Sequence, residues 1–75
     1  MYEQISQILV ESFQIRPAEL RPDTTLDELG MDSLEVVELG MALGDLGAQV
    51  TEDELIAAQR LDAIGDLVAR RAAAA

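Results

Sequence analysis

Residues 29–35 read Leu-Gly-Met-Asp-Ser-Leu-Glu and mark the start of an amphipathic helix that we expect to extend to about Leu46. Asp32 is a favourable N-cap because its carboxylate accepts hydrogen bonds from the first unpaired backbone N–H groups of a helix. Glu35, three residues later, completes the pattern of a capping box. Ser33 therefore occupies the first helical position, where the N–H groups and the helix dipole favour a phosphate. On this local chemistry alone, Ser33 is either an attachment point or an ordinary helix-start residue.

The helix expected after Ser33 carries apolar residues on two faces. At about 100° per residue, one stripe forms an ordinary core face and consists of Val36, Leu39, Leu43 and Leu46. A second stripe lies nearly opposite and consists of Leu34, Val37 and Met41, flanked by the acidic residues Glu35, Glu38 and Asp45. Because one helix of a small bundle cannot easily bury two opposite faces, we expect the second stripe to be partly exposed and to bind a partner. The alternative is that a loop covers it.

Residues 29–39 closely resemble the signature of acyl carrier proteins, in which the serine of a Gly-x-Asp-Ser-Leu run carries 4′-phosphopantetheine. Residues 23–26, Asp-Thr-Thr-Leu, resemble the long first loop of that family, and residues 64–68, Ile-Gly-Asp-Leu-Val, are similar to its last helix. The order and spacing of these segments extend the resemblance over nearly the whole chain.

The resemblance implies a function. Ser33 would carry 4′-phosphopantetheine, transferred from coenzyme A by a phosphopantetheinyl transferase, with Asp32 as the flanking cap. The terminal thiol of this arm would hold acyl intermediates as thioesters for fatty acid or polyketide-type biosynthesis. Acyl-transferring and synthase enzymes with basic docking patches would bind the helix through Leu34, Glu35, Val37, Glu38 and Met41, with Asp45 on the same acidic flank.

Two other functions remain open. A carrier of aminoacyl, peptidyl or D-alanyl groups would share the modified serine and the bundle, although peptidyl carriers more often resemble Gly-Gly-His-Ser at this point. An unmodified acidic docking module, whose second helix binds a basic groove, would share the acidic surface without needing Ser33.

Two glycines, Gly40 and Gly44, lie four residues apart inside the same expected helix. Each costs up to ~1 kcal/mol of helix stability relative to alanine. Acyl carrier proteins commonly have bulkier apolar or acidic residues there, so this is a departure from the family. Either tertiary packing tolerates a weak helix, or the missing side chains leave room for a cargo chain or a close partner backbone. Gly47 is a natural C-cap.

The composition indicates one small acidic domain, residues 1–75, with a single modest core. Fifteen acidic residues against five basic ones give a formal charge of −10. Such a chain should avoid nucleic acid and anionic membranes and should be attracted to basic protein surfaces. No stretch approaches the ~18 apolar residues of a membrane span, and no basic segment followed by an apolar run begins the chain. We therefore expect a monomeric, cytoplasmic protein that does not insert into membranes.

The first helix is expected over residues 2–13, with its core face consisting of Ile5, Ile8, Leu9 and Phe13. Pro17 disfavours continuation of that helix through Arg16, and residues 16–31 are expected to form a long loop that brings Ser33 to the surface. Pro22 is a second helix breaker within this loop.

The third helix is expected over residues 52–58, because Thr51 and Glu54 form a second capping box, and Leu55 and Ile56 are expected to face inward. The acidic run here lacks the alternating acids and central glycine of a calcium loop, so we expect no metal site. The last helix is expected from near Asp62, with three residues toward the core: Ile64, Leu67 and Val68. Two arginines near its end, Arg70 and Arg71, complement the helix dipole. Residues 72–75 are expected to fray.

The predicted fold is all-α: a four-helix bundle with three longer helices, one short third helix and a long loop between the first two. The chain has no histidine, cysteine or lysine, so the usual general bases and covalent nucleophiles are missing. We expect a protein with no catalytic residues of its own, whose chemistry belongs to the enzymes that it visits.

Overall fold

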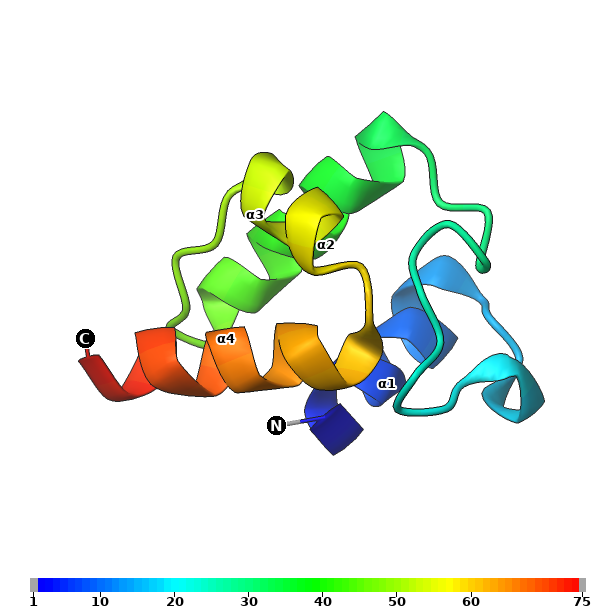
Figure 1. Ribbon diagram of the computed structural model, residues 1–75, viewed down its shortest axis with the longest axis horizontal. Coiled ribbons are helices and arrows are strands. Elements are labelled where there is room, and N and C mark those ends of the chain that lie inside the picture. The colour runs from blue at the N-terminus through cyan, green and yellow to red at the C-terminus, as the bar shows by residue number, and fades with distance from the viewer. Residues whose placement is uncertain (1, 75) are drawn as a thin grey trace.

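The computed structural model describes residues 2–74, which form four α-helices and one short 3-10 helix (Figure 1). The α-helices are α1 (Tyr2–Phe13), α2 (Ser33–Asp45), α3 (Glu52–Ala58) and α4 (Leu61–Ala74). The 3-10 helix η1 (Pro17–Glu19) lies in the long loop between α1 and α2 and was not predicted. The all-α bundle with three longer helices and a short third one is confirmed. No helix within residues 2–74 combines the length and the apolar character needed to cross a bilayer.

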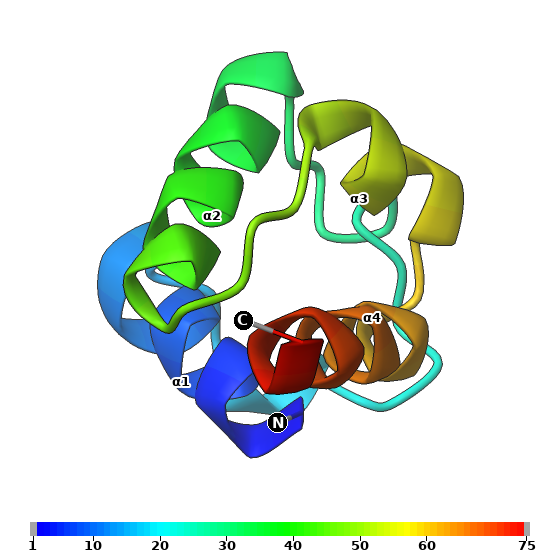
Figure 2. The same ribbon diagram turned by 90° about the vertical axis from the view of Figure 1, so that its left-hand side faces the viewer.

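The helices pack as two pairs around one core. α1 and α4 lie side by side, and α2 and α3 lie together across from them (Figure 2). All four helices and the long loop contribute side chains that are fully buried: Ile5, Leu9, Leu26, Leu39, Leu43, Leu55, Leu61, Ile64 and Val68. α1 approaches α4 closely at Gly65, where an added Cβ would lie only 3.4 Å from the backbone nitrogen of Tyr2.

α1 ends without a glycine. Gln14 adopts a left-handed conformation with φ of 58°, and the N–H of Ile15 donates to the carbonyl of Leu9 at 3.1 Å. A left-handed residue directly after a helix is commonly glycine, and Gln14 takes that place here. Of the predicted core face of α1, Ile5 and Leu9 are fully buried, whereas Ile8 and Phe13 lie half-buried at the edge of the core.

The long loop is fixed to the start of α4. The carbonyl of Thr24 accepts from the N–H of Leu61, and the carbonyl of Pro22 accepts from the N–H of Asp62, both at 2.9 Å. These two bonds satisfy N–H groups that a helix start leaves unpaired. Thr24 is itself buried, and its hydroxyl accepts from the N–H of Arg21 and donates to the carbonyl of Glu19. The segment that leads to Ser33 is therefore held by defined contacts.

The prediction that Leu46 continues the core face of α2 was wrong. α2 ends at Asp45, and Leu46 is its C-cap residue, with 39% of its surface exposed. The chain then turns at Gly47, which has a φ of +92°, and Ala48 enters the core in place of Leu46. Helical periodicity does not place a side chain beyond the last helical residue. The left-handed conformation expected for a glycine after the helix is confirmed at Gly47.

The prediction that Ile56 faces inward was also wrong. In the short α3, Leu55 is fully buried, but Ile56 has 44% of its surface exposed. The side chains of successive helical residues point about 100° apart around the helix axis. A helix that buries Leu55 therefore turns Ile56 toward its flank. In α4, Ile64 and Val68 are buried as predicted, and Leu67 is half-buried. α4 continues to Ala74 and packs Ala72 against the core, whereas we expected residues 72–75 to fray. Ala75 lies outside the described residues.

α3 and α4 are joined by an ion pair between Glu54 and Arg71. The Arg71 guanidinium donates to both carboxylate oxygens of Glu54 and also to the carbonyl of Gln49, 3.0 Å away. Glu54 accepts in addition from the N–H of Thr51 at 3.0 Å, which confirms the second capping box. The hydrogen bonds from Arg71 and from the Thr51 N–H lower the pKa of Glu54 from 4.5 to about 2. Arg71 therefore has a specific partner beyond the helix dipole.

Candidate functional site

The site is built at the N-terminus of α2 by a reciprocal pair of hydrogen bonds. Asp32 is extended, with φ of −85° and ψ of 178°, and its Oδ1 accepts from the N–H of Glu35 at 2.9 Å. Glu35 Oε1 accepts from the N–H of Asp32 at 3.2 Å. The predicted capping box is confirmed, and it fixes the first turn of the helix around Ser33.

Ser33 is the first residue of α2 and is exposed. Its hydroxyl makes no hydrogen bond to any of residues 2–74. The preceding segment turns at Gly30, which has a φ of +71°, and is anchored by buried Met31, whose N–H donates to the carbonyl of Leu26 at 3.2 Å. An exposed hydroxyl thus stands beside the positive end of a 13-residue helix.

A hollow of about 310 Å³ lies beside Ser33. Its walls come from the long loop, α2 and the end of α3: Leu26, Asp27, Met31, Asp32, Val36, Ile56 and Gln59. The exposed Ile56 is therefore part of this hollow, which explains a large apolar side chain outside the core. The apolar side chains among these walls, Leu26, Met31, Val36 and Ile56, are suited to cover part of an apolar group attached to the neighbouring hydroxyl.

Gln59 fixes one wall of this hollow, and the sequence did not single it out. Its φ of 60° and ψ of −56°, with the N–H of Arg60 donating to the carbonyl of Ala58 at 2.6 Å, describe a γ-turn. Its side-chain Oε1 accepts from the N–H of Asp27, and its carbonyl accepts from the N–H of Leu26, both at 3.1 Å. The α3–α4 junction is thereby tied to the loop that presents Ser33.

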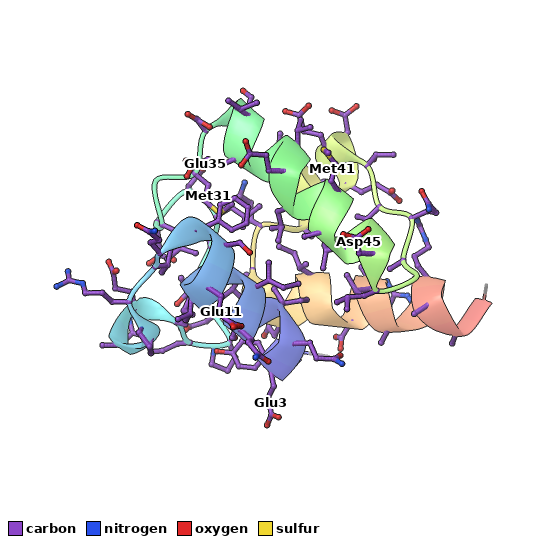
Figure 3. All side chains as sticks on the ribbon, turned by 180° about the vertical axis from the view of Figure 1, so that it is seen from behind. Glu3, Glu11, Met31, Glu35, Met41 and Asp45 are labelled. Carbon is purple, nitrogen blue, oxygen red and sulfur yellow. The ribbon has the colours of Figure 1, made fainter. Side chains whose placement is uncertain are left out.

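The second apolar stripe of α2 is exposed, as predicted. Leu34, Val37 and Met41 expose 66%, 40% and 68% of their surface, and no loop covers them. Glu35, Met41 and Asp45 lie at successive points along α2 (Figure 3). Glu38 and Asp45 are exposed, whereas Glu35 is half-buried because it caps the helix. Asp45 ends α2, about 18 Å along the helix axis from Ser33 at 1.5 Å per residue, so the two mark opposite ends of one surface.

Comparison with known proteins gives the family. A family model described as a phosphopantetheine attachment site matches residues 3–68. The acyl carrier protein of Wolinella succinogenes is 31% identical over 91% of this chain and 88% of its own length. That of Campylobacter hominis is 34% identical over 91% of this chain and 85% of its own length. The chain belongs to the acyl carrier protein family. No solved structure matches it significantly.

Membership of the acyl carrier protein family implies a covalently attached 4′-phosphopantetheine group and a carrier that is not itself a catalyst. The start of α2 fits such a group, because an exposed serine hydroxyl lies where a helix N-terminus favours the phosphate and where a hollow with apolar and polar walls adjoins it. Asp32 and Glu35 are satisfied by each other and leave the hydroxyl accessible. Of the predicted site residues, these two and Ser33 meet at one end of α2, and the others follow along its exposed side.

Proposed function

We propose that Ser33 is the residue to which this acyl carrier protein attaches 4′-phosphopantetheine. The observation that carries the proposal is the exposed Ser33 hydroxyl at the first position of α2, inside the Asp32–Glu35 capping box. When attached, the group supplies a flexible arm ending in a thiol that holds acyl groups as thioesters.

The residues around Ser33 have separate tasks in this proposal. The unpaired N–H groups of the first turn offset the charge of a phosphodiester. The Asp32 carboxylate accepts a hydrogen bond from the N–H of Glu35. The helix therefore fixes the position of this negative charge next to the site of the phosphate. The Asp32–Glu35 pair acts on positioning alone, since it fixes the turn that carries the hydroxyl.

We propose that the cargo is an acyl chain of fatty acid or polyketide-type biosynthesis and that it lies partly in the hollow beside Ser33. The apolar side chains of Leu26, Met31 and Ile56 support this proposal, because they can cover part of an acyl chain. Gln59, as part of the wall, positions the hollow through its bonds to the long loop.

We propose further that the phosphopantetheinyl transferase and the synthase enzymes dock on α2. The exposed stripe of Leu34, Val37 and Met41 supplies a small apolar contact. The surrounding acids and the formal charge of −10 favour encounter with basic surfaces, and the small size of the apolar contact keeps the complexes weak enough to exchange.

Digestion with a protease that cleaves before aspartate tests the attachment site. It releases residues 32–44 as one peptide, in which Ser33 is the only hydroxyl residue. After loading with coenzyme A and a transferase, we expect the phosphopantetheine mass on this peptide. Its appearance on any other peptide would contradict the assignment.

A further inference from the structure

The hollow beside Ser33 is lined as much by polar residues as by apolar ones. The apolar lining residues are Leu26, Met31, Val36 and Ile56. The polar lining residues are Asp27, Asp32, Ser33 and Gln59. An acyl chain makes use of the apolar residues alone. The polar residues therefore indicate a second kind of occupant, one that carries hydrogen-bonding groups of its own.

Gln59 uses only half of its side-chain amide within the protein. Its Oε1 accepts from the N–H of Asp27 at 3.1 Å, so the donor Nε2 lies on the other side of the amide group. Nε2 takes part in none of the hydrogen bonds found within residues 2–74. It is also open to solvent, because Ser6 Oγ is the only enclosed side-chain nitrogen or oxygen without a partner in that part of the chain. Gln59 therefore brings a free donor to the hollow.

Asp27 brings an acceptor next to this donor. Its backbone N–H holds Gln59, whereas its carboxylate forms none of the hydrogen bonds or ion pairs found within residues 2–74. Both residues line the same hollow. A free donor and a free acceptor on one wall suit a chain with repeated secondary amides, because each amide has a carbonyl that accepts and an N–H that donates.

The arm of phosphopantetheine is such a chain, since secondary amides alternate with methylene groups between its phosphate and its thiol. We propose that Gln59 Nε2 donates to the carbonyl of one amide of the arm attached to Ser33, and that the Asp27 carboxylate accepts from the N–H of another. The arm then lies along the polar wall, beside the apolar side chains that we assign to the cargo. The inference rests on the proposed attachment at Ser33 and adds how the arm is held.

The contact positions the arm without fixing it permanently. Hydrogen bonds at a surface open to water contribute little net free energy, because water competes for the same groups. An enzyme that visits the carrier can therefore displace the arm from Gln59 and Asp27.

Side-chain amide signals test the proposal. The chain has five glutamines and no asparagine, so the ¹⁵N-labelled protein gives only five side-chain NH₂ signals. These are compared in the whole protein before and after loading with phosphopantetheine. We expect the NH₂ signal of Gln59 to shift and to show nuclear Overhauser effects to the arm. The signals of Gln4 and Gln7, which are exposed on α1, should stay unchanged.

A matched arm separates the effect of the amides from that of the phosphate. A coenzyme A analogue in which methylene groups replace the amides of pantetheine places the same phosphodiester on Ser33. With this arm, we expect the shift of the Gln59 NH₂ signal to be lost.

Two variants test the two contacts separately, with the arm labelled with ¹⁵N. Gln59→Glu keeps an oxygen for the N–H of Asp27 but removes the donor, and Asp27→Ala removes the acceptor. In the parent, we expect the order parameters of the arm's amides to exceed about 0.6, the upper range of flexible segments, and to fall below it in both variants. Gln7→Glu and Asp66→Ala, the same chemical changes at exposed positions of α1 and α4, should keep the parent's values.

Equal shifts of the Gln59 signal with the two arms would overturn the proposal. Equal order parameters in the parent, Gln59→Glu and Asp27→Ala would also overturn it. Intact mass reports the loading of Ser33 separately. A carrier that is loaded on Ser33 but leaves the Gln59 signal in place would therefore refute the contact with the arm and leave the attachment site standing.

Discussion

Asp32 and Glu35 are joined by two hydrogen bonds of opposite direction, each from one residue's backbone N–H to the other's carboxylate. The pair closes the first turn of α2 around Ser33 and uses acidic groups that also lie at the positive end of the helix. The same two residues thus set both the stability of α2 and the place where its serine is presented.

Replacing Asp32 should measurably destabilise the fold. Asp32→Ala removes the acceptor for the N–H of Glu35, and we expect the free energy of unfolding to fall by about 0.5–2 kcal/mol. Urea unfolding followed by circular dichroism measures this. Asp27→Ala is the same chemical change at an exposed loop residue, and the side chain of Asp27 forms none of the hydrogen bonds found within residues 2–74. This control should lower the free energy of unfolding by less than Asp32→Ala does. Equal losses in the two variants would contradict the capping role.

Two glycines at the end of α2 should respond in opposite directions to alanine. Gly44→Ala should stabilise the protein by up to ~1 kcal/mol, because its Cβ meets open space in a helix. Gly47→Ala should destabilise it by about 1–2 kcal/mol, because residue 47 has a φ of +92°. Thermal unfolding of both variants measures the difference, and a lower midpoint for Gly44→Ala than for the parent would contradict the structure.

The Glu54–Arg71 pair should make stability depend on acidity below neutral pH. Because the pKa of Glu54 is lowered from 4.5 to about 2, the folded state favours the ionised carboxylate. This contribution is complete above about pH 4.5 and is lost as the pH falls toward 2. Glu54→Gln should therefore lose less thermal stability than the parent over that interval. Glu11→Gln, at an exposed position of α1, should lose thermal stability with falling pH at the same rate as the parent. If Glu54→Gln also lost stability at the parent's rate, the Glu54–Arg71 pair would be excluded as the cause.

Reversing one charge beside the exposed stripe should slow loading by a basic transferase. Glu38 is exposed and belongs to no ion pair found within residues 2–74, so Glu38→Lys changes the field of α2 without touching its cap. We expect kcat/KM for loading to fall by up to about tenfold at low salt, and the difference to shrink as salt is added. Glu11→Lys on α1 gives the same net charge and should have a smaller effect. If the two variants load equally slowly, net charge rather than the α2 surface governs encounter.

The local features of this fold were predictable from the sequence. The capping boxes at Asp32 and Thr51 involve residues three apart, and the exposed stripe of α2 follows from helical periodicity, so neither depends on distant parts of the chain. Leu46 was misplaced because it lies beyond the last residue of α2, where helical periodicity no longer fixes the direction of a side chain. Ile56 was misplaced because periodicity does not say which side of a helix is buried, and tertiary packing decides this.

The contacts that hold the site in place were not predictable. Gln59 bonds to Asp27 across 32 residues of sequence, and Thr24 is buried by contacts within its loop and with the start of α4. Neither residue stands out by type or spacing, because polar residues of loops are identified by the backbone groups that they meet in the folded chain. The hollow beside Ser33 likewise depends on how α3 and its flanking segments lie against α2.

The central claim is that Ser33 carries the prosthetic group. Intact mass spectrometry after incubation with coenzyme A, magnesium and a broad-specificity phosphopantetheinyl transferase tests it most directly, with Ser33→Ala treated in parallel. We predict that the parent protein gains the mass of one phosphopantetheine unit and that Ser33→Ala gains none. An equal gain in Ser33→Ala, or no gain in the parent with several transferases, would contradict the account.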